Sequence, residues 1–186
     1  MRRVTLLVAM VVSATSASPA GAQTRLHTHG VAELNIAIDG RTGLLEFTAT
    51  AQDVYGFERE PRTPAERLRR AQRIAALRTQ FASIVLFDSQ LGCTISPIEV
   101  HAGNDSHAHD DRTGGHFHAG EDARGQLHVD VHGEYALRCA TAPAGHDIRF
   151  AVTRTYPSIR TVLVRMRSDT IGIVARVERD SGAVRP

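Results

Sequence analysis

Residues 127–139 read LHVDVHGEYALRC, and their side chains alternate between apolar and polar along almost the whole stretch. An alternation of period two is typical of a β-strand with one apolar and one polar face. Only Gly133 interrupts the apolar row, while the polar row begins with His128, Asp130 and His132, all metal-ligand residue types. The stretch therefore predicts a strand that forms one wall of a metal site. A solvated strand face that happens to hold two histidines is the alternative.

The length and charge of the chain indicate how many domains it has and which kinds of partner it is unsuited to bind. A length of 186 residues suits one domain with a substantial hydrophobic core. The formal charge is +2, and Arg2 and Arg3 account for it, so the chain beyond them is neutral. A neutral chain offers no compositional case for binding nucleic acid or an anionic membrane surface.

Residues 1–22 have the three parts of a secretory signal peptide. A start with two arginines precedes an apolar segment over residues 4–12, which is too short to span a bilayer. Ala20-Gly21-Ala22 is a small-x-small cleavage site, and no later segment reaches the roughly 18 apolar residues of a membrane helix. We therefore expect an exported protein that begins at Gln23 and lies in a bacterial periplasm.

A second pair of histidines, His27 and His29, precedes a predicted β-hairpin. Its first strand alternates over residues 31–38, a turn follows at 39–43, and the second strand alternates over 44–51. A spacing of two places both imidazoles on the polar face of the first strand. A single His-x-His is a weak metal signal, because such a pair is often merely solvated.

A helix is predicted from residue 64 to about residue 83. Thr63 suits the N-cap, and Glu66 completes a capping box. The apolar stripe consists of Leu68, Ala71, Ile74, Ala75, Phe81 and Ala82, and the basic side consists of Arg67, Arg69, Arg70, Arg73 and Arg78. A solvated basic face is the ordinary interpretation of the second set, and a docking surface for an acidic partner is the alternative.

The segment over residues 102–126 differs in composition from the rest. It is low in large apolar residues and rich in His, Asp and Gly, so we expect a long flexible loop. Its ligand clusters contain His107, His109, His116 and His118. Imidazole and carboxylate together suit Zn²⁺ best among common ions, and they also suit Ni²⁺ and Cu²⁺.

Predicted strands flank this loop and complete the chain. A strand over residues 93–101 is disturbed at Pro97, which indicates a bulge or a sheet edge. Three later strands are predicted over 147–154, 161–167 and 171–177.

The two cysteines of the chain, Cys93 and Cys139, stand on either side of the loop. In an oxidising compartment an isolated pair predicts a disulfide. Two thiolate metal ligands are the alternative. Cys139 lies on the apolar face of its strand, away from the histidine row, so we prefer the disulfide.

The order of these motifs resembles that of the ZrgA-like family of zinc-regulated periplasmic proteins. The resemblance covers essentially all of the chain after residue 22, and HTHGVAELNIAIDG (27–40) and HVDVHGEYALRC (128–139) are its most specific parts. It implies a periplasmic zinc binder that supports high-affinity zinc uptake beside an ABC importer, through the importer's substrate-binding component. Arg59 is a departure, because family members often carry a His there; if that His is a ligand, the site of this chain is altered or weaker.

The sequence predicts an α+β fold with one main helix and a mostly antiparallel, sandwich-like sheet of about eight strands, from which the long His-rich loop extends. We expect one zinc-binding domain over residues 23–180 and a frayed tail over 181–186. The predicted function is reversible Zn²⁺ binding that buffers the ion or delivers it for import, without catalysis.

Two kinds of zinc site are predicted. Ligands held by strands lose little entropy on binding and should form the tight site. These are His27, His29, His128, Asp130 and His132, which are also the positions that the resemblance assigns to the metal motifs. The loop histidines have to be ordered at each binding event and should form weak sites. His101 can join either kind, because a bulge at Pro97 would turn it towards the face of His132.

Other functions remain as alternatives. A zinc hydrolase would use Glu33 or Glu134 as a general base, but the chain has no HExxH or GxSxG motif. A copper chaperone is disfavoured, because Cu(I) prefers Met and Cys, and only Met166 remains after the leader. A protein that binds Ni²⁺ or Cu²⁺ stays open, because both ions compete well for imidazole sites.

Overall fold

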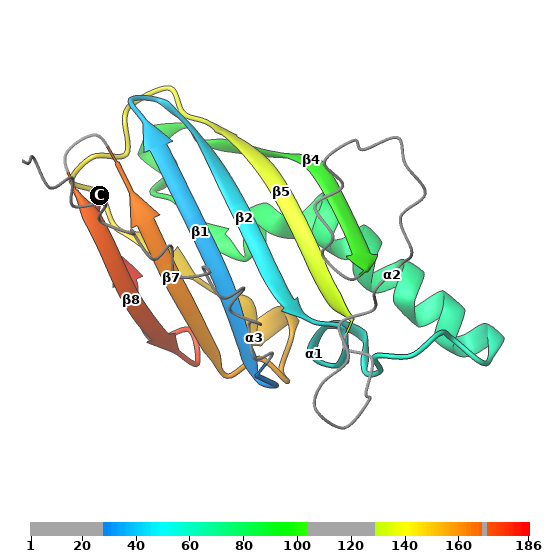
Figure 1. Cartoon of the computed structure of the whole chain (residues 1–186). Helices are drawn as coiled ribbons and strands as arrows, with labels where there is room; N and C mark the ends of the chain where they lie inside the picture. The colour runs from blue at the N-terminus through cyan, green and yellow to red at the C-terminus, as the bar shows by residue number, and fades with distance from the viewer. Residues whose placement is uncertain (1–27, 104–128, 169–170) are drawn as a thin grey trace, which may run out of the picture.

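The computed structural model describes residues 28–103, 129–168 and 171–186, and one large sheet dominates their fold (Figure 1). The sheet has the strand order β4-β5-β2-β1-β7-β8. Its strands are β1 (Val31–Asp39), β2 (Thr42–Thr50), β4 (Thr94–Gly103), β5 (Asp130–Arg138), β7 (Thr161–Arg167) and β8 (Gly172–Glu178). Neighbouring strands are antiparallel except β1 and β7, which are parallel.

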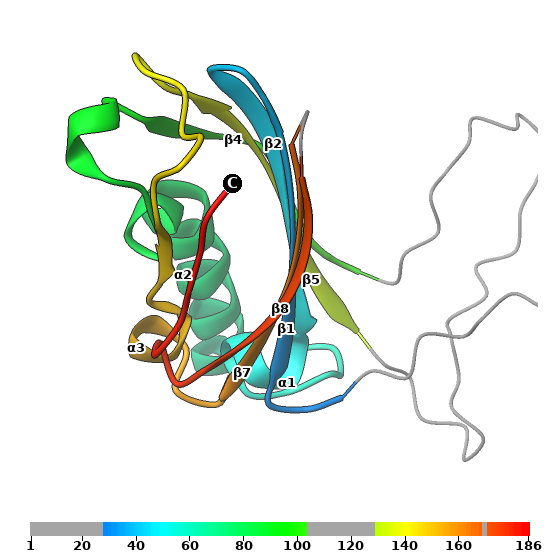
Figure 2. The same ribbon diagram turned by 90° about the vertical axis from the view of Figure 1, so that its left-hand side faces the viewer.

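A second layer covers the concave face of this sheet, with α2 (Pro64–Gln80) as its main element (Figure 2). A small sheet of order β3-β6-β9 lies in the same layer. The shorter elements are α1 (Ala51–Tyr55), η1 (Phe81–Ser83), β3 (Val85–Leu86), η2 (Ser89–Leu91), β6 (Ile148–Phe150), α3 (Val152–Thr155) and β9 (Ala183–Val184). The prediction of an α+β fold with one main helix is confirmed. No helix within the described ranges is long and apolar enough to cross a membrane.

The hydrophobic core lies between the two layers and uses the apolar rows that the alternation predicted. In β5, Val131, Tyr135 and Leu137 are fully buried. Tyr135 stacks on Phe81 with 3.6 Å between ring centroids and donates a hydrogen bond to the carbonyl of Leu77 at 3.2 Å. Because these rows face α2, the polar rows of the same strands lie on the open face of the sheet.

Helix α2 begins as predicted, but the predicted apolar stripe packs against the core only at Ile74 and Phe81. The Thr63 hydroxyl accepts a hydrogen bond from the Glu66 backbone, and the Glu66 carboxylate accepts one from the Thr63 backbone, which completes the capping box. Leu77 is the buried residue of the helix, whereas Leu68 is 58 % exposed. The prediction for Leu68 was therefore wrong. The reason is that the N-terminal half of α2 reaches past the β4 edge of the sheet (Figure 1).

The strand predicted over residues 147–154 is only partly present. β6 ends at Phe150, and α3 follows it. The Asp180 carboxylate accepts hydrogen bonds from the backbone N–H groups of Thr153 and Arg154, at 2.9 and 3.1 Å. These bonds satisfy donors in the first turn of α3, so a residue distant in sequence favours a helical turn where the local pattern indicates a strand.

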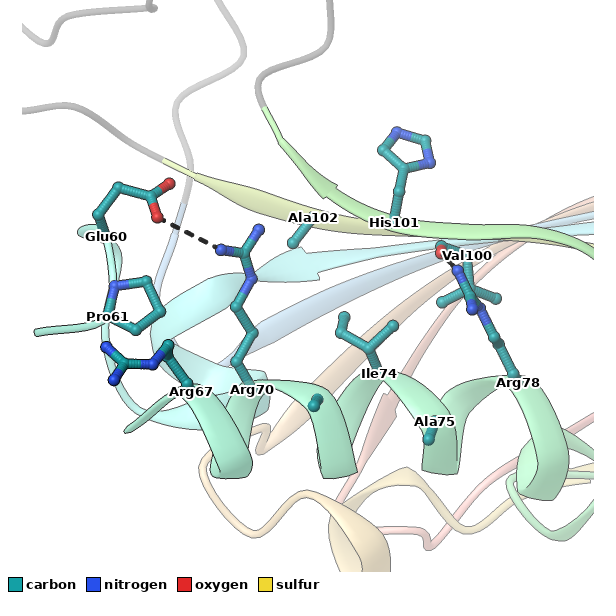
Figure 3. Close-up of a pocket in the computed structure, with 11 residues that line it drawn as sticks. Glu60, Pro61, Arg67, Arg70, Ile74, Ala75, Arg78, Val100, His101 and Ala102 are labelled. Atoms are coloured by element: carbon teal, nitrogen blue, oxygen red, sulfur yellow. Dashed lines mark hydrogen bonds and ion pairs between the residues drawn. The ribbon is translucent and has the colours of Figure 1, made fainter. Parts of the chain in front are cut away.

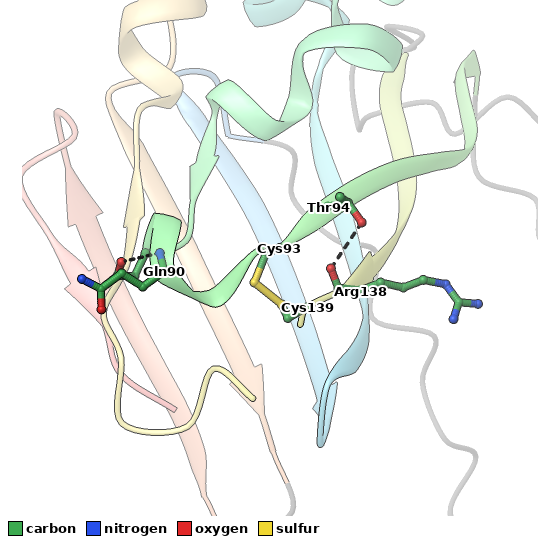
Figure 4. Close-up of a disulfide and its surroundings, with 6 residues drawn as sticks. Gln90, Cys93, Thr94, Arg138 and Cys139 are labelled. Atoms are coloured by element: carbon green, nitrogen blue, oxygen red, sulfur yellow. Dashed lines mark hydrogen bonds between the residues drawn. A yellow bond between two sulfur atoms is a disulfide. The ribbon is translucent and has the colours of Figure 1, made fainter. Parts of the chain in front are cut away.

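A disulfide joins Cys93 to Cys139 and confirms the predicted pairing (Figure 4). It ties the start of β4 to the end of β5, beside the Cα partners Thr94 and Arg138. The two strands are thus crosslinked at the end of the sheet opposite to the 104–128 segment, which leaves from Gly103.

Candidate metal centre

The candidate metal ligands gather where β2 and β4 end and β5 begins. The last row of cross-strand partners consists of Gly103, Asp130 and Thr50, and the next row on the same face consists of His101, His132 and Thr48. The segment 104–128 connects Gly103 to Val129, so both of its attachment points lie beside the last row.

His101 and His132 face each other across β4 and β5. Their ring centroids are 5.5 Å apart, and the rings are tilted by 36°. A register shift between Pro97 and Glu99 brings His101 opposite His132. The prediction that an irregularity at Pro97 turns His101 towards the face of His132 is therefore confirmed.

The environment of His132 orients its ring. Its Nδ1 lies 3.2 Å from the Thr48 hydroxyl on β2, and its Nε2 is shielded from solvent. A hydrogen bond at one imidazole nitrogen fixes the orientation of the ring and therefore the direction in which the other nitrogen points. Metal-binding histidines usually have such a hydrogen bond. In the tautomer that donates from Nδ1 to Thr48, Nε2 presents the lone pair that a metal requires.

His29 reaches the same end of the sheet from the turn before β1, and not from the strand face on which it was predicted. Its Nδ1 lies 3.4 Å from the Thr50 hydroxyl and 3.7 Å from a carboxylate oxygen of Glu58. Thr50 is the Cα partner of Asp130, which is 4 % exposed. His29 and the polar row of β5 are therefore brought to the same end of the sheet through β2, a relation that the sequence left open.

Asp53 holds the backbone beside His29 in place. Its carboxylate accepts hydrogen bonds from the Gly30 N–H at 2.7 Å and from the Thr50 hydroxyl at 2.9 Å. Gly30 has φ +80°, a conformation that a glycine adopts without strain. Asp53 was not predicted; the Thr-x-x-Asp spacing at the start of α1 is the signal that indicates it, because Thr50 is the N-cap of that helix.

Two further carboxylates that the sequence analysis missed contact the histidines. Glu58 contacts His29, and a carboxylate oxygen of Glu99 lies 3.4 Å from Nδ1 of His101. Glu58 follows the hairpin in a loop without a metal motif, so only the fold brings it to His29. Glu99 stands two residues before His101 on β4, and strand alternation could have predicted that contact.

Arg59, which stands where family members often carry a His, binds a residue at the start of α2. Its guanidinium donates to both carboxylate oxygens of Glu66, at 2.6 and 2.9 Å. This bond, followed by the backbone bond from Arg62, lowers the pKa of Glu66 to about 2. The arginine therefore strengthens the start of α2.

Glu33, one of the two residues considered as a hydrolytic base, is also engaged. Its carboxylate accepts a hydrogen bond from Arg165 of β7 at 2.7 Å. The carboxylate is thus held by a side chain of the neighbouring strand.

The described residues do not by themselves complete a site. Within ranges 28–103, 129–168 and 171–186, no three His, Cys, Asp or Glu side chains lie close enough together to hold a metal ion. The predicted ligands outside those ranges are His27, His107, His109, His116, His118 and His128. Their part in a site stays a prediction, as does the signal peptide.

Together, these features define a class: an α+β protein that gathers imidazole and carboxylate side chains at one end of its sheet, beside the β4–β5 connection. The chain belongs to the ZrgA family, because the sequence model of this family, described as a ZrgA family zinc uptake protein, matches residues 26–185. No functionally curated protein matches the chain. The family description indicates a role in zinc uptake.

Proposed function

We propose that this protein binds Zn²⁺ reversibly in the periplasm and buffers the ion or delivers it to the substrate-binding component of an ABC importer. The family supports zinc uptake as the general role. The observation that carries the proposal further is the facing pair of His101 and His132, with Asp130 beside it in the last row of the sheet. Imidazole and carboxylate are the ligands that such a reversible zinc site needs.

The tight site is assigned to the ends of β4 and β5. Zn–N bonds are about 2.0–2.1 Å long, so the two facing imidazoles would turn towards each other to share one ion. A closed zinc site has four ligands, and the described residues bring together fewer than that. We assign the remaining positions to Asp130 and His128 of the β5 segment and to the histidines that precede β1.

Binding should be reversible with pH. Imidazole binds a metal only in its neutral form, and its ordinary pKa is about 6.5. Zinc affinity should therefore be high at pH 7.5 and fall as the pH drops through about 6.5. This pH dependence suits a protein that delivers zinc for import, because protonation of the ligands releases the ion while the protein stays folded.

Calorimetric titration of the purified exported protein with Zn²⁺ at pH 7.5 tests the proposal. At least one ion should bind, and metal analysis of protein taken directly from the periplasm should find zinc. If the protein binds no zinc at pH 7.5, the proposal is falsified. If the native protein contains nickel or copper, its function is the binding of that ion.

Two variants then locate the tight site. The double variant His101→Ala with His132→Ala should remove the tightest binding and leave weak binding. Replacing residues 104–126 by a short Gly-Ser turn should lower the stoichiometry and keep the tightest affinity. If the loop replacement removes the tight site instead, the loop histidines are the primary ligands.

A hydroxyl variant tests the role of the ring orientation. Thr48→Val removes the partner of His132 Nδ1 and should weaken zinc binding by about 10–100-fold, the usual effect of losing a partner that orients a metal ligand. Thr42→Val, on the same strand at its other end, is the matched control and should leave the affinity unchanged. Equal effects of the two substitutions would contradict the assignment.

A further inference from the structure

A groove of about 560 Å³ runs between α2 and the edge strand β4 (Figure 3). Helix α2 lines one side with Arg67, Arg70, Ile74 and Arg78, and β4 lines the other with Val100 and Ala102. The ring of His101 points to the opposite side of β4. His101 nevertheless belongs to the lining, so the groove adjoins the candidate metal centre, while its arginines lie on the α2 side of β4.

The groove carries positive charge that the described part of the chain does not neutralise. Among the described carboxylates, Arg67 and Arg78 have no ion-pair partner, and Arg70 pairs with Glu60 alone, at 3.6 Å. The Glu60 side chain is 91 % exposed, and exposed pairs of this kind contribute little. An acidic occupant is the complement of such a surface.

The spacing of the lining residues matches an extended peptide. Arg70, Ile74 and Arg78 stand on successive turns of α2, about 6 Å apart along its axis. Alternate residues of an extended chain are about 6.6 Å apart. An acidic residue, an apolar residue and a second acidic residue at positions i, i+2 and i+4 would thus meet Arg70, Ile74 and Arg78 in turn.

The edge of β4 supports an extended occupant. Arg78 donates a hydrogen bond at 2.7 Å to the carbonyl of Val100, so this backbone group points out of the sheet and towards the groove. Free edges of sheets bind extended segments through outward backbone groups, and the Val100 carbonyl would be available to such a segment once Arg78 turns to an acidic side chain. Two of the large apolar side chains exposed on the described surface, Leu68 and Ile98, belong to α2 and β4, the two elements that form the groove.

The chain itself offers no suitable occupant. Acidic residues four positions apart occur only at Asp130 and Glu134, where His132 stands between them and all three belong to β5. We propose that the groove between α2 and β4 binds an extended segment of a partner protein with the pattern acidic-x-apolar-x-acidic. The proposal does not depend on zinc binding.

Fluorescence anisotropy with a labelled Ser-Asp-Thr-Leu-Thr-Glu-Ser peptide and the purified exported protein tests this, in EDTA and at low salt. Saturable binding with a dissociation constant below about 1 mM is expected. Arg70→Glu should weaken binding by about tenfold or more, because it places like charges together. Arg69→Glu, an exposed position on the same helix that does not line the groove, is the matched control and should change affinity by less than about twofold.

A charge exchange makes the test specific. A peptide with Lys in place of Asp should bind the Arg70→Glu variant better than it binds the native protein. Circular dichroism and the urea midpoint show whether that variant is folded; Arg70→Gln, with a smaller expected loss, replaces it if it is not. The proposal is overturned by absence of saturation up to about 1 mM, by equal effects of Arg69→Glu and Arg70→Glu, or by equal binding of a scrambled peptide or free glutamate.

Discussion

Gly133→Ala should destabilise the fold, because no space for a side chain exists at this position on β5. An ideal Cβ at residue 133 would lie 2.5 Å from Oη, 2.7 Å from Cε2 and 2.9 Å from Cζ of Tyr135. The ring cannot move aside freely, because it is fully buried, stacks on Phe81 and donates to the carbonyl of Leu77. The single interruption in the apolar row of this strand thus makes room for the tyrosine.

The size of the effect follows from two costs and one gain. Inserting a methyl group into a packed core costs about 1–3 kcal/mol. Displacing Tyr135 also weakens its hydrogen bond to Leu77, worth about 0.5–1.5 kcal/mol. Alanine in a strand gains about 0.5–1 kcal/mol over glycine, because less backbone entropy is lost on folding. The free energy of unfolding should therefore fall by about 1–3 kcal/mol.

Urea unfolding followed by circular dichroism measures this loss. Gly172→Ala on β8 is the matched control and should change stability by less than about 0.5 kcal/mol, because nothing lies within 4 Å of its Cβ position. In a Tyr135→Leu background, Gly133→Ala should cost at least about 1 kcal/mol less than in the native protein. An unchanged cost in that background would refute the argument that the tyrosine ring occupies the space.

The remaining predictions concern the crosslink and the start of α2. Replacing both Cys93 and Cys139 by Ala should lower the free energy of unfolding by roughly 4 kcal/mol, since the disulfide spans a separation of 46 residues; a loss below about 1 kcal/mol in urea titrations would contradict this. The contact of Glu66 with Arg59 keeps its folded-state pKa at about 2, below its ordinary 4.5, so its stabilising effect is complete above pH 4.5 and disappears as the pH falls towards 2. The stability difference between the native protein and Glu66→Gln should accordingly be largest near neutral pH and shrink below pH 4.5, and a difference independent of pH would contradict the assignment.

The fold explains how candidate ligands from separate segments of the chain come to lie at one end of the sheet. β2 lies between β1 and β5, so Thr50 contacts His29 and pairs with Asp130. β4 lies on the other side of β5, so His101 meets His132. Three segments distant in sequence thus bring their polar rows to one end of the sheet, where the 104–128 segment is also attached.

The sequence by itself determined the faces of the strands, the start of α2 and the disulfide. Alternation along β5 predicted which side chains are buried, and Thr63 with Glu66 predicted the helix start. These features depend on neighbours within a few residues, or on the only cysteine pair in the chain, so local patterns suffice to predict them.

Only the tertiary structure decided which polar rows meet. The pairing of His101 with His132 depends on a register shift at Pro97, and the contact of Glu58 with His29 depends on the path of a loop. Asp180 likewise favours a helical turn at Thr153, in a stretch whose own pattern is that of a strand. The physical reason is that alternation is a property of one strand alone, whereas its neighbours and register follow from the packing of the whole core.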